Sequence, residues 1–421
     1  MKKTRMAQRN SLIAALDVGS SKIACFIARI GDDGKPKVTG IGHHLSRGVR
    51  AGTIIDMEQA ELAISTTINA AEQMAGETIR SVIVNLSGGN PASQTLSVEV
   101  PINGREIGDH DVGRVLYQGN QFNSLADRRM IHSIPVGYSI DGAKGIRDPR
   151  GMFGERLGVD MHVITAAAGA VRNLTNCVAR CHLDVSALVV SPYAAGLAAL
   201  VEDEIDLGVT VIDMGAGTTS LAVFVDGNVV YTDSVPIGGG HVTNDIARGL
   251  STPLAHAERL KTLYGHCRVS PADEREMIQV PQVGEDDQHL SAPVPRSLLI
   301  GIIQPRLEET FELVRSRLEQ SGFDKVAGRR VVLTGGANQL AGTRELAQLV
   351  LDKQVRMGRP LHIAGLADAT NGPAFAAVSG LLTYAAQAEV EAGLLRKGRS
   401  AKPTPTTGWL GRFGFWLKEN F

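Results

Sequence analysis

The chain has 421 residues, with 43 basic and 44 acidic side chains, so its formal net charge is −1. This balance argues against a dedicated nucleic-acid-binding protein. Hydrophobic residues make up 43% of the chain, which excludes general disorder, and the length suffices for two or three globular units.

The first eleven residues are basic, but the apolar run that follows, 12–16, is too short for a secretory signal, so export is not expected. Three nearly uncharged stretches, 81–98, 185–201 and 369–388, are each interrupted by Asn, Ser, Pro or Gly, and none is expected to span a membrane. The cysteines form no C-x-x-C pair, and reduced thiols in a cytosolic protein are expected rather than a metal site or disulfides: Cys25, Cys177, Cys181 and Cys267.

In the first half of the chain, residues 11–30 are predicted to form a strand, a Gly/Ser turn and a strand. A helix is predicted over 57–74 and a buried strand over 81–86. The following stretch, to about residue 164, mixes strand-like alternation with turn clusters and is predicted to be a separate insert.

In the second half, residues 187–201 have the apolar composition of a helix, and 208–225 repeats the strand–turn–strand plan. A glycine turn and a helix carrying Glu258 and Lys261 are predicted within 238–265, and a loop over 280–297. A long helix interrupted at Pro305 follows over 298–318, and then a strand over 330–334 before another glycine turn. Residues 391–407 lose apolar periodicity and are predicted to be a flexible linker.

The two strand–turn–strand segments match each other. Aligning IAALDVGSSKIACFIA with VTVIDMGAGTTSLAVF pairs Asp17 with Asp213 and Gly19 with Gly215, which indicates an internal duplication. Two related halves of this kind predict an α/β protein with a cleft between two lobes.

Three glycine-containing turns are candidate phosphate-binding loops, because glycine lets backbone N–H groups approach phosphate oxygens: DVGSSK at 17–22, DMGAGTT at 213–219 and TGGAN at 334–338. A Walker A motif is absent, and no G-x-G-x-x-G follows the first strand. We expect the first two hairpins to clamp a nucleoside triphosphate from opposite lobes, with Asp17 and Asp213 reaching Mg²⁺ through its waters. Taken singly, each turn could be a steric feature, each aspartate a turn cap, and Glu258 with Lys261 a surface ion pair.

These motifs resemble those of the actin-like ATPases, and within them the bacterial cell division FtsA family. LDVGSSK and IDMGAGTTS are similar to the two phosphate motifs, and VVLTGGANQLAG to the adenosine motif. The segments 132–165 and 236–265 also resemble FtsA. The resemblance implies an actin-like ATPase fold, with two duplicated ribonuclease-H-like lobes around a nucleotide cleft and an inserted FtsA-type subdomain in place of one actin subdomain.

The resemblance implies ATP and Mg²⁺ as ligands and assigns site residues. Phosphate contacts are implied for Gly19, Ser20, Ser21 and Lys22 on one side, and for Gly215, Gly217, Thr218 and Thr219 on the other. Gly335, Gly336 and Asn338, with Glu258 and Lys261, are implied to flank adenosine, and Gly239 to lie in the adjoining turn. Hydrolysing relatives place a Gln or Glu where this chain offers Ser191, a poor general base, so at most slow ATP hydrolysis is expected.

The implied domain boundaries are discontinuous. The first core lobe comprises 1–84, 165–200 and 364–390, and the second 201–236 and 305–363. The inserted subdomain is expected at 85–164, the upper subdomain of the second lobe at 237–304, the linker at 391–407 and a terminal amphipathic helix at 408–421.

The last 13 residues hold five aromatics, although 4% of 13 would be about half of one. On a helix, one arc of about 140° holds six apolar residues: Trp409, Leu410, Phe413, Trp416, Leu417 and Phe421. Thirteen helical residues span about 20 Å, so this helix is expected to lie in the membrane interface rather than cross it. The alternative is a helix that docks on the protein's own core or in a partner groove.

The resemblance thus implies a cell division protein that polymerises on the cytoplasmic face of the inner membrane. It would anchor the FtsZ ring at the division site through the terminal helix and help to recruit later division proteins. The FtsZ C-terminal tail is expected near 237–304, with Arg306 as a candidate contact. Two alternatives share the fold, a small-molecule kinase and a pilus-assembly relative; the first lacks a convincing catalytic base, and the terminal helix and the insert argue against the second.

Overall fold

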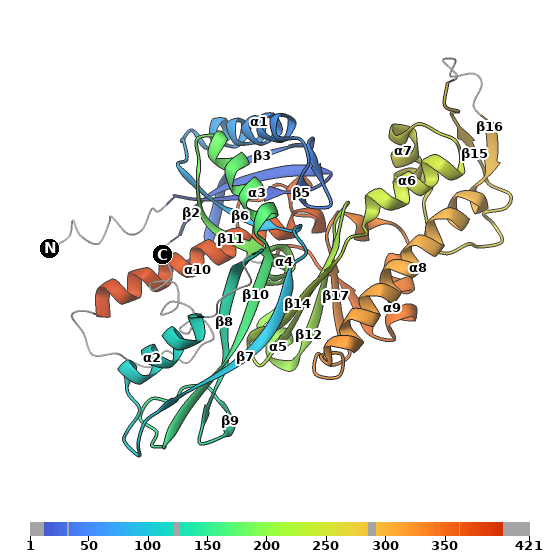
Figure 1. Cartoon of the computed structure of the whole chain (residues 1–421). Helices are drawn as coiled ribbons and strands as arrows, with labels where there is room; N and C mark the ends of the chain where they lie inside the picture. Colours follow the sequence, from blue (N-terminus) through green and yellow to red (C-terminus); the bar gives the residue numbers. More distant parts are fainter. Residues whose placement is uncertain (1–11, 32, 122–126, 285–291, 362, 399–421) are drawn as a thin grey trace.

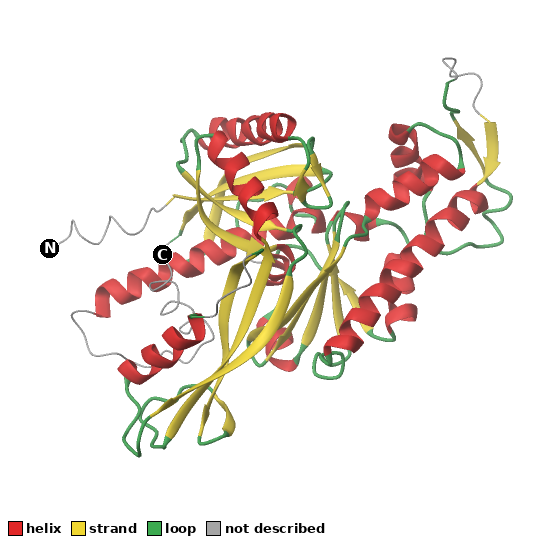
Figure 2. Cartoon of the chain, viewed as in Figure 1, coloured by secondary structure: helices red, strands yellow, loops and turns green. Residues whose placement is uncertain are grey.

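The computed structural model describes residues 12–31, 33–121, 127–284, 292–361 and 363–398, the last ten as backbone only (Figure 1). It contains two five-stranded sheets and a separate four-stranded sheet, around which the helices pack (Figure 2). This is the α/β organisation that the duplicated hairpins predicted.

The first lobe is built on a sheet with the strand order β11-β6-β1-β2-β3. β1 and β2 form an antiparallel hairpin, β6 runs parallel to β1, and β11 runs parallel to β6. The strands are β1 (Leu12–Val18), β2 (Lys22–Ile30), β3 (Pro36–Leu45), β6 (Ser81–Leu86) and β11 (Asp184–Val190). A short hairpin of β4 (Val49–Arg50) and β5 (Thr53–Ile54) follows β3.

Alternate residues of β2 face opposite sides of this sheet, as the two-residue period of a strand requires. Ile23, Cys25 and Ile27 pack with helices α1 (Met57–Ala75) and α3 (Ala168–Arg180). Ala24, Phe26 and Ala28 pack with helices α4 (Ser191–Ala199) and α10 (Ala376–Gly398) on the other face. The sheet is therefore covered on both faces, which explains its nearly continuous apolar strands.

Helix α1 shows why the predicted helix forms where it does. Asp56 caps its first turn by accepting a hydrogen bond from the Gln59 N–H at 3.1 Å. Small and branched apolar residues recur along one face and are buried, among them Ala60, Ile64 and Ile68. Gly76, in the left-handed conformation with φ 68°, ends the helix.

The second lobe repeats the first. Its sheet has the order β14-β13-β12-β17-β18, with an antiparallel β12–β13 hairpin and two parallel neighbours. The strands are β12 (Val209–Met214), β13 (Thr219–Val225), β14 (Asn228–Val235), β17 (Arg330–Thr334) and β18 (Gln354–Met357). Since the matching hairpin occupies the matching place in each sheet, the internal duplication is confirmed.

One face of the second sheet packs on helices α6 (Gly239–Gly249), α8 (Arg296–Ser321) and α9 (Thr343–Leu351). Its other face shares a hydrophobic core with α4 and α10 of the first lobe. Helices α6 and α7 (Leu254–Tyr264), the hairpin of β15 (Met277–Val280) with β16 (Ala292–Pro295), and the start of α8 project away from the sheet (Figure 1). Short elements α5 (Glu202–Leu207), η2 (Gly336–Gln339), η3 (Asp368–Thr370) and η4 (Pro373–Phe375) complete the lobes.

The insert has a sheet and a hydrophobic core of its own. The strand order is β7-β10-β8-β9, and α2 (Asp109–Asn120) packs on one face. The strands are β7 (Ala92–Pro101), β8 (Arg128–Ile140), β9 (Ala143–Ile146) and β10 (Arg156–Ala167). The tight turn between β8 and β9 uses Asp141 and Gly142, both with positive φ, as their sequence suggested.

Several sequence expectations were wrong in detail. Residues 187–201, expected to be helical, begin as β11, because Val185 to Val190 pair with β6; only 191–199 are helical. Residues 280–297, expected to be a loop, include the paired strand β16. Pro305 does not interrupt α8, which runs through it. Two helices, α6 and α7, occupy the segment 238–265.

The expected linker starts too early, since α10 continues to Gly398 and so includes 391–398. The rest of the linker and the terminal helix at 408–421 lie outside the described residues. Within the described ranges, no helix is both long enough and apolar enough to cross a bilayer. All four cysteines are described, and they form no disulfide.

Candidate nucleotide-binding site

The turn between β1 and β2 is the first candidate phosphate loop. The Gly19 N–H donates to the Lys22 carbonyl oxygen at 3.1 Å, which closes the turn around Ser20 and Ser21. A Cβ on Gly19 would lie 2.8 Å from that carbonyl oxygen, so the turn requires glycine. The Ser20 hydroxyl accepts a hydrogen bond from the Gly52 N–H at 3.0 Å.

Asp17, at the end of β1, is buried, with 7% of its surface exposed. Its Oδ1 accepts a hydrogen bond of 2.6 Å from the side-chain amide of Asn85 in β6. The same amide nitrogen donates to the Ser191 hydroxyl at 3.1 Å, and the Asn85 oxygen accepts from the Val18 N–H at 2.7 Å. Asn85 therefore fixes Asp17 and Ser191 together, a role that sequence reasoning missed.

Lys22 lies beside this carboxylate, with Nζ 3.6 Å from Asp17 Oδ2. Nζ also donates to the Ala374 carbonyl oxygen at 2.5 Å and lies 4.3 Å from the centre of the Phe375 ring. The contact with the face of Phe375 is a cation–π interaction. Neither Ala374 nor Phe375 was predicted, because both come from η4, about 350 residues away in the chain.

The β12–β13 turn is the second candidate phosphate loop and has the same closure. The Gly215 N–H donates to the Thr218 carbonyl oxygen at 2.9 Å. A Cβ on Gly217 would lie 2.5 Å from Ser20 Oγ and 2.9 Å from Ala51 Cα. The two hairpins therefore approach each other closely, with no space for a side chain between them. Thr219 is fully buried, and its hydroxyl has no hydrogen-bond partner in the described structure.

Asp213 occupies the place in the second hairpin that Asp17 has in the first. Burial, reinforced by the negative charge of Asp17 and opposed by Lys22, raises the pKa of Asp213 to about 7. Burial likewise raises the pKa of Asp17, against the attraction of Lys22. The carboxylate of buried Asp17 interacts electrostatically with that of half-buried Asp213, and such a pair is suited to a bound cation.

The third turn follows β17. Gly335 has φ +88°, and a Cβ there would lie 2.5 Å from Asp213 Oδ1. Gly336 begins η2, within which the Gln339 amide donates to the Gly336 carbonyl oxygen at 3.3 Å. Asn338 is fully buried, yet neither its amide nitrogen nor its amide oxygen has a partner in the described structure. Such buried polar atoms are costly unless something satisfies them.

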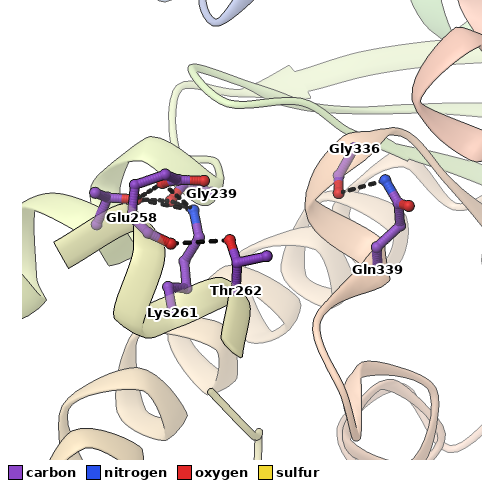
Figure 3. Close-up of polar contacts among 7 residues, drawn as sticks. Gly239, Glu258, Lys261, Thr262, Gly336 and Gln339 are labelled. Atoms are coloured by element: carbon purple, nitrogen blue, oxygen red, sulfur yellow. Dashed lines mark hydrogen bonds and ion pairs between the residues drawn. The ribbon is translucent and has the colours of Figure 1, made fainter. Parts of the chain in front are cut away.

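Glu258 and Lys261 lie together on α7, beside the turn that begins α6. Lys261 Nζ is 2.7 Å from Glu258 Oε2 and donates to the Gly239 carbonyl oxygen at 3.1 Å. The Thr243 hydroxyl joins them, donating to Glu258 at 2.5 Å and accepting from Lys261 at 2.8 Å. Figure 3 shows this group and the Gly336–Gln339 turn as two separate groups of polar contacts. A Cβ on Gly239 would lie 2.8 Å from the Ala337 Cβ, so α6 and η2 touch.

The structure thus brings the two hairpins into contact, the Gly335 turn against Asp213, and the start of α6 against η2. Ser191 lies at the start of α4, with 3% of its surface exposed. Arg306 lies apart on α8, where it is ion-paired with Asp245 and Glu309, each at 2.5 Å. The six predicted membrane-binding residues, Trp409, Leu410, Phe413, Trp416, Leu417 and Phe421, lie outside the described residues.

These residues fit a nucleoside triphosphate with Mg²⁺ in three respects. Two glycine turns, one from each lobe, bring the backbones of the candidate phosphate loops close together. The carboxylates of buried Asp17 and half-buried Asp213 both have raised pKa values, interact with each other and could hold the cation. The unsatisfied amide of Asn338 could hydrogen-bond a polar ligand. A bound Mg²⁺ would supply neutralisation of phosphate charge.

Comparison with protein-family models finds two matches. Residues 210–380 match the model described as cell division protein FtsA, and residues 88–165 match the SHS2 domain inserted in FtsA. The second match spans the insert, with its separate sheet.

Curated relatives match over nearly the whole chain. The cell division protein FtsA of Agrobacterium fabrum (strain C58) is 45% identical over 425 residues, covering 99% of this chain and 96% of the relative. The FtsA of Escherichia coli (strain K12) is 34% identical over 433 residues, covering 99% of each.

Similar solved structures share the fold at low identity. The PilM–PilN type IV pilus biogenesis complex matches with a TM-score of 0.61 at 18% identity, covering 89% of this chain and 98% of that one. MreB5 of Spiroplasma citri bound to ADP matches with a TM-score of 0.51 at 13% identity, covering 93% and 99%. These neighbours show an actin-like ATPase fold. Because curated relatives are up to 45% identical over nearly their full length, the chain belongs to the FtsA family of bacterial cell division proteins.

Proposed function

We propose that this protein binds ATP with Mg²⁺ between its lobes, polymerises, and anchors the FtsZ ring to the inner membrane through its terminal amphipathic helix. The observation that carries the nucleotide part is the close approach of the two hairpins, in which the carboxylates of Asp17 and Asp213 interact. The family relationship supports the role in division.

In this proposal the backbone and hydroxyl groups of the two hairpins hold the phosphates: Gly19, Ser20, Ser21, Gly215, Gly217, Thr218 and Thr219. The Lys22 amine, which donates to the Ala374 carbonyl oxygen in the described structure, would turn toward the phosphate when nucleotide binds. Asp17 and Asp213 hold Mg²⁺ through its waters. Gly239, Glu258, Lys261, Gly335, Gly336 and Asn338 flank the adenosine.

Hydrolysis is proposed to be slow at most. Ser191 occupies the position where hydrolysing relatives orient water, and its hydroxyl accepts a hydrogen bond from Asn85. A hydroxyl is a weak base at neutral pH, so Ser191 is not suited to activate water strongly. ATP would act mainly as a ligand that closes the cleft.

The membrane part rests on the sequence of the terminal segment. The aromatic arc that includes Trp409, Phe413 and Trp416 would enter the lipid interface, and the basic residues before it would add attraction to anionic lipid. In this proposal the protein lies peripherally on the cytoplasmic face of the inner membrane, at the division site.

The FtsZ C-terminal tail is proposed to bind the part of the second lobe formed by residues 237–304. Arg306 would contribute only if an acidic peptide displaced Asp245 and Glu309, which now neutralise its guanidinium. The insert is proposed to contact neighbouring protomers or later division proteins.

Flotation with anionic vesicles tests the anchor. The full chain is expected to float, and a chain ending at Thr407 is expected to remain in the dense fraction. Trp416→Ala removes an aromatic from the apolar arc and should reduce flotation several-fold, whereas Phe415→Ala, outside the arc, is the matched control. Equal flotation of the truncated and full chains would overturn the anchor.

A further inference from the structure

Two histidines of the insert are buried where it meets both lobes. His132 in β8 and His162 in β10 are 1% and 0% exposed. In the antiparallel register His162 pairs with Ile134 and His132 with Ile164, so both histidines lie on the same face of the insert sheet. Ile134 and Ile164 of that face belong to the core shared with α4, α10 and the second sheet. Figure 1 shows β8 and β10 running toward α4 and β14.

Each histidine is bonded to the backbone of a different lobe. His132 Nε2 accepts a hydrogen bond of 3.2 Å from the Val190 N–H, at the end of β11 in the first lobe. His162 Nδ1 lies 3.0 Å from the Val229 carbonyl oxygen, in β14 of the second lobe. These partners fix both tautomers. An N–H partner requires a lone pair on His132 Nε2, and a carbonyl partner requires a proton on His162 Nδ1.

The other ring atoms are complementary. A neutral His132 must carry its proton on Nδ1, and a neutral His162 must carry a lone pair on Nε2. Both atoms are buried, and neither has a hydrogen-bond partner in the described structure. One buried water could accept from His132 Nδ1–H and donate to His162 Nε2. Leaving these two buried groups without partners would cost free energy.

We propose that His132 and His162 are positioning residues that share a buried water and so form an oriented hydrogen-bond chain from the first lobe, through the insert, to the second lobe. In this chain the Val190 N–H donates to His132, His132 Nδ1–H to the water, the water to His162 Nε2, and His162 Nδ1–H to the Val229 carbonyl oxygen. Each ring nitrogen of the two histidines then has a partner.

The first-lobe end of this chain adjoins the candidate nucleotide-binding site. Val190 is followed by Ser191, which Asn85 links to Asp17. At the second-lobe end, the Asn228 amide donates to the Val136 carbonyl oxygen at 3.1 Å, and the Ser93 hydroxyl accepts from the Thr232 N–H at 3.1 Å. A change at Asp17 therefore has a continuous path of contacts into β8. We infer that cleft occupancy sets the position of the insert, which rests on the proposed nucleotide binding.

The tautomers are tested without nucleotide. Long-range ¹H–¹⁵N correlation spectra of histidine-labelled full chain, assigned with His132→Gln and His162→Asn, are expected to show both rings neutral at pH 7.5 and protonated at Nδ1. This is the minor tautomer of free histidine in water. An Nε2–H tautomer at either ring would overturn the hydrogen-bond chain.

The coupling is tested by hydrogen exchange with and without a non-hydrolysable ATP analogue and Mg²⁺. In the wild type the analogue is expected to slow exchange in β8, β10 and β14. His132→Leu should keep nucleotide affinity within about twofold but lose this response, whereas His132→Gln, which retains an acceptor for Val190, should keep it. A full response in a folded His132→Leu chain would overturn the coupling. If the wild type does not bind the analogue, the proposed nucleotide binding and the coupling are both overturned. The hydrogen-bond chain through the histidines is still tested separately by the tautomer measurement.

Discussion

The ionised carboxylates of Asp17 and Asp213 are expected to destabilise the ligand-free fold but to favour the binding of a cation. A buried carboxylate beside another is disfavoured in its charged form, which is why the pKa of Asp213 rises to about 7. Since this folded-state pKa lies above the ordinary value of 3.8, the group favours the fold at low pH, and that contribution is lost as pH rises through 7. A cation between the carboxylates would reverse the penalty.

Asp213→Asn is therefore expected to stabilise the ligand-free protein at pH 8, by on the order of 2 to 4 kcal/mol, while abolishing Mg²⁺-dependent nucleotide binding. Thermal or urea unfolding and a nucleotide titration measure the two effects. Asp203→Asn, at an exposed position of α5, is the control and should change neither. A destabilised Asp213→Asn chain that binds nucleotide normally would contradict this assignment.

The pH dependence of Mg²⁺ binding follows from the same pKa. Mg²⁺ requires the ionised carboxylate, so below pH 7 it must displace a proton from Asp213. The apparent affinity for Mg²⁺ in the nucleotide complex is expected to be constant above about pH 8 and to fall up to tenfold per unit below pH 7. Titrations from pH 5.5 to 8.5 measure it. An affinity that is flat across this range would show that Asp213 does not face the metal.

At the level of single residues, the sequence predicted turn residues well and their supporting partners poorly. The Asp-x-Gly turns were recognisable because glycine and aspartate are adjacent in the chain and have a clear physical role there. Asn85 and Phe375 were missed, since each reaches the site only through the fold. The one available signal was a single polar residue, Asn85, near the end of the apolar strand β6.

At the level of elements, the geometry of the candidate nucleotide-binding site depends on the close approach of the two hairpins. Gly217→Ala would place a Cβ 2.5 Å from Ser20 Oγ and 2.9 Å from Ala51 Cα, so the hairpins must separate. Nucleotide affinity is expected to fall about tenfold or more, because anion-binding N–H groups work only in a fixed geometry. Calorimetric titration measures this change. Gly301→Ala, where nothing lies within 4 Å, is the control, and equal affinities would contradict the predicted contact.

Whole elements were predicted where periodicity and capping agree, as in α1, β6 and both hairpins. The errors occurred where local signals conflicted with tertiary pairing. Val185 to Val190 are apolar enough for a helix, but their β-branched residues pair with β6. Pro305 was expected to interrupt α8, yet the helix passes through it, since tertiary packing of both halves outweighs the lost hydrogen bond.

At the scale of the whole molecule, the two lobes and the insert share one buried core, and His132 and His162 lie within or beside it. Burial, with the nearby His162, lowers the pKa of His132 to about 3. Burial, opposed by the Val229 carbonyl, lowers that of His162 to about 4. Both pKa values lie below the ordinary value of 6.5, so as the pH falls these histidines are protonated in the unfolded chain before they are protonated in the folded one.

Stability is therefore expected to fall as pH drops below 6.5, by roughly 2 kcal/mol per histidine at pH 5. Urea unfolding at pH 7.5 and 5 measures the loss. The double variant His132→Gln with His162→Asn should remove most of the difference, whereas replacing the exposed His44 should leave it unchanged. An equal loss in the double variant would place the pH sensitivity elsewhere.

The overall architecture was the most predictable level, because the duplicated hairpin and the motif resemblance both span most of the chain. The matched strand orders of the two sheets confirm the duplication. The placement of the insert against both lobes could not be predicted, since it depends on contacts such as His162 to Val229, between residues 67 positions apart.

We propose that an ATP-binding actin-like body brings FtsZ to the membrane through its terminal helix. Co-sedimentation of purified FtsZ with anionic vesicles, in the presence of ATP and Mg²⁺, tests it most directly, with the full chain compared with a chain lacking residues 408–421. FtsZ is expected to sediment with the vesicles only when the full chain is present. Equal recruitment by the shortened chain, or recruitment by neither form, would contradict it.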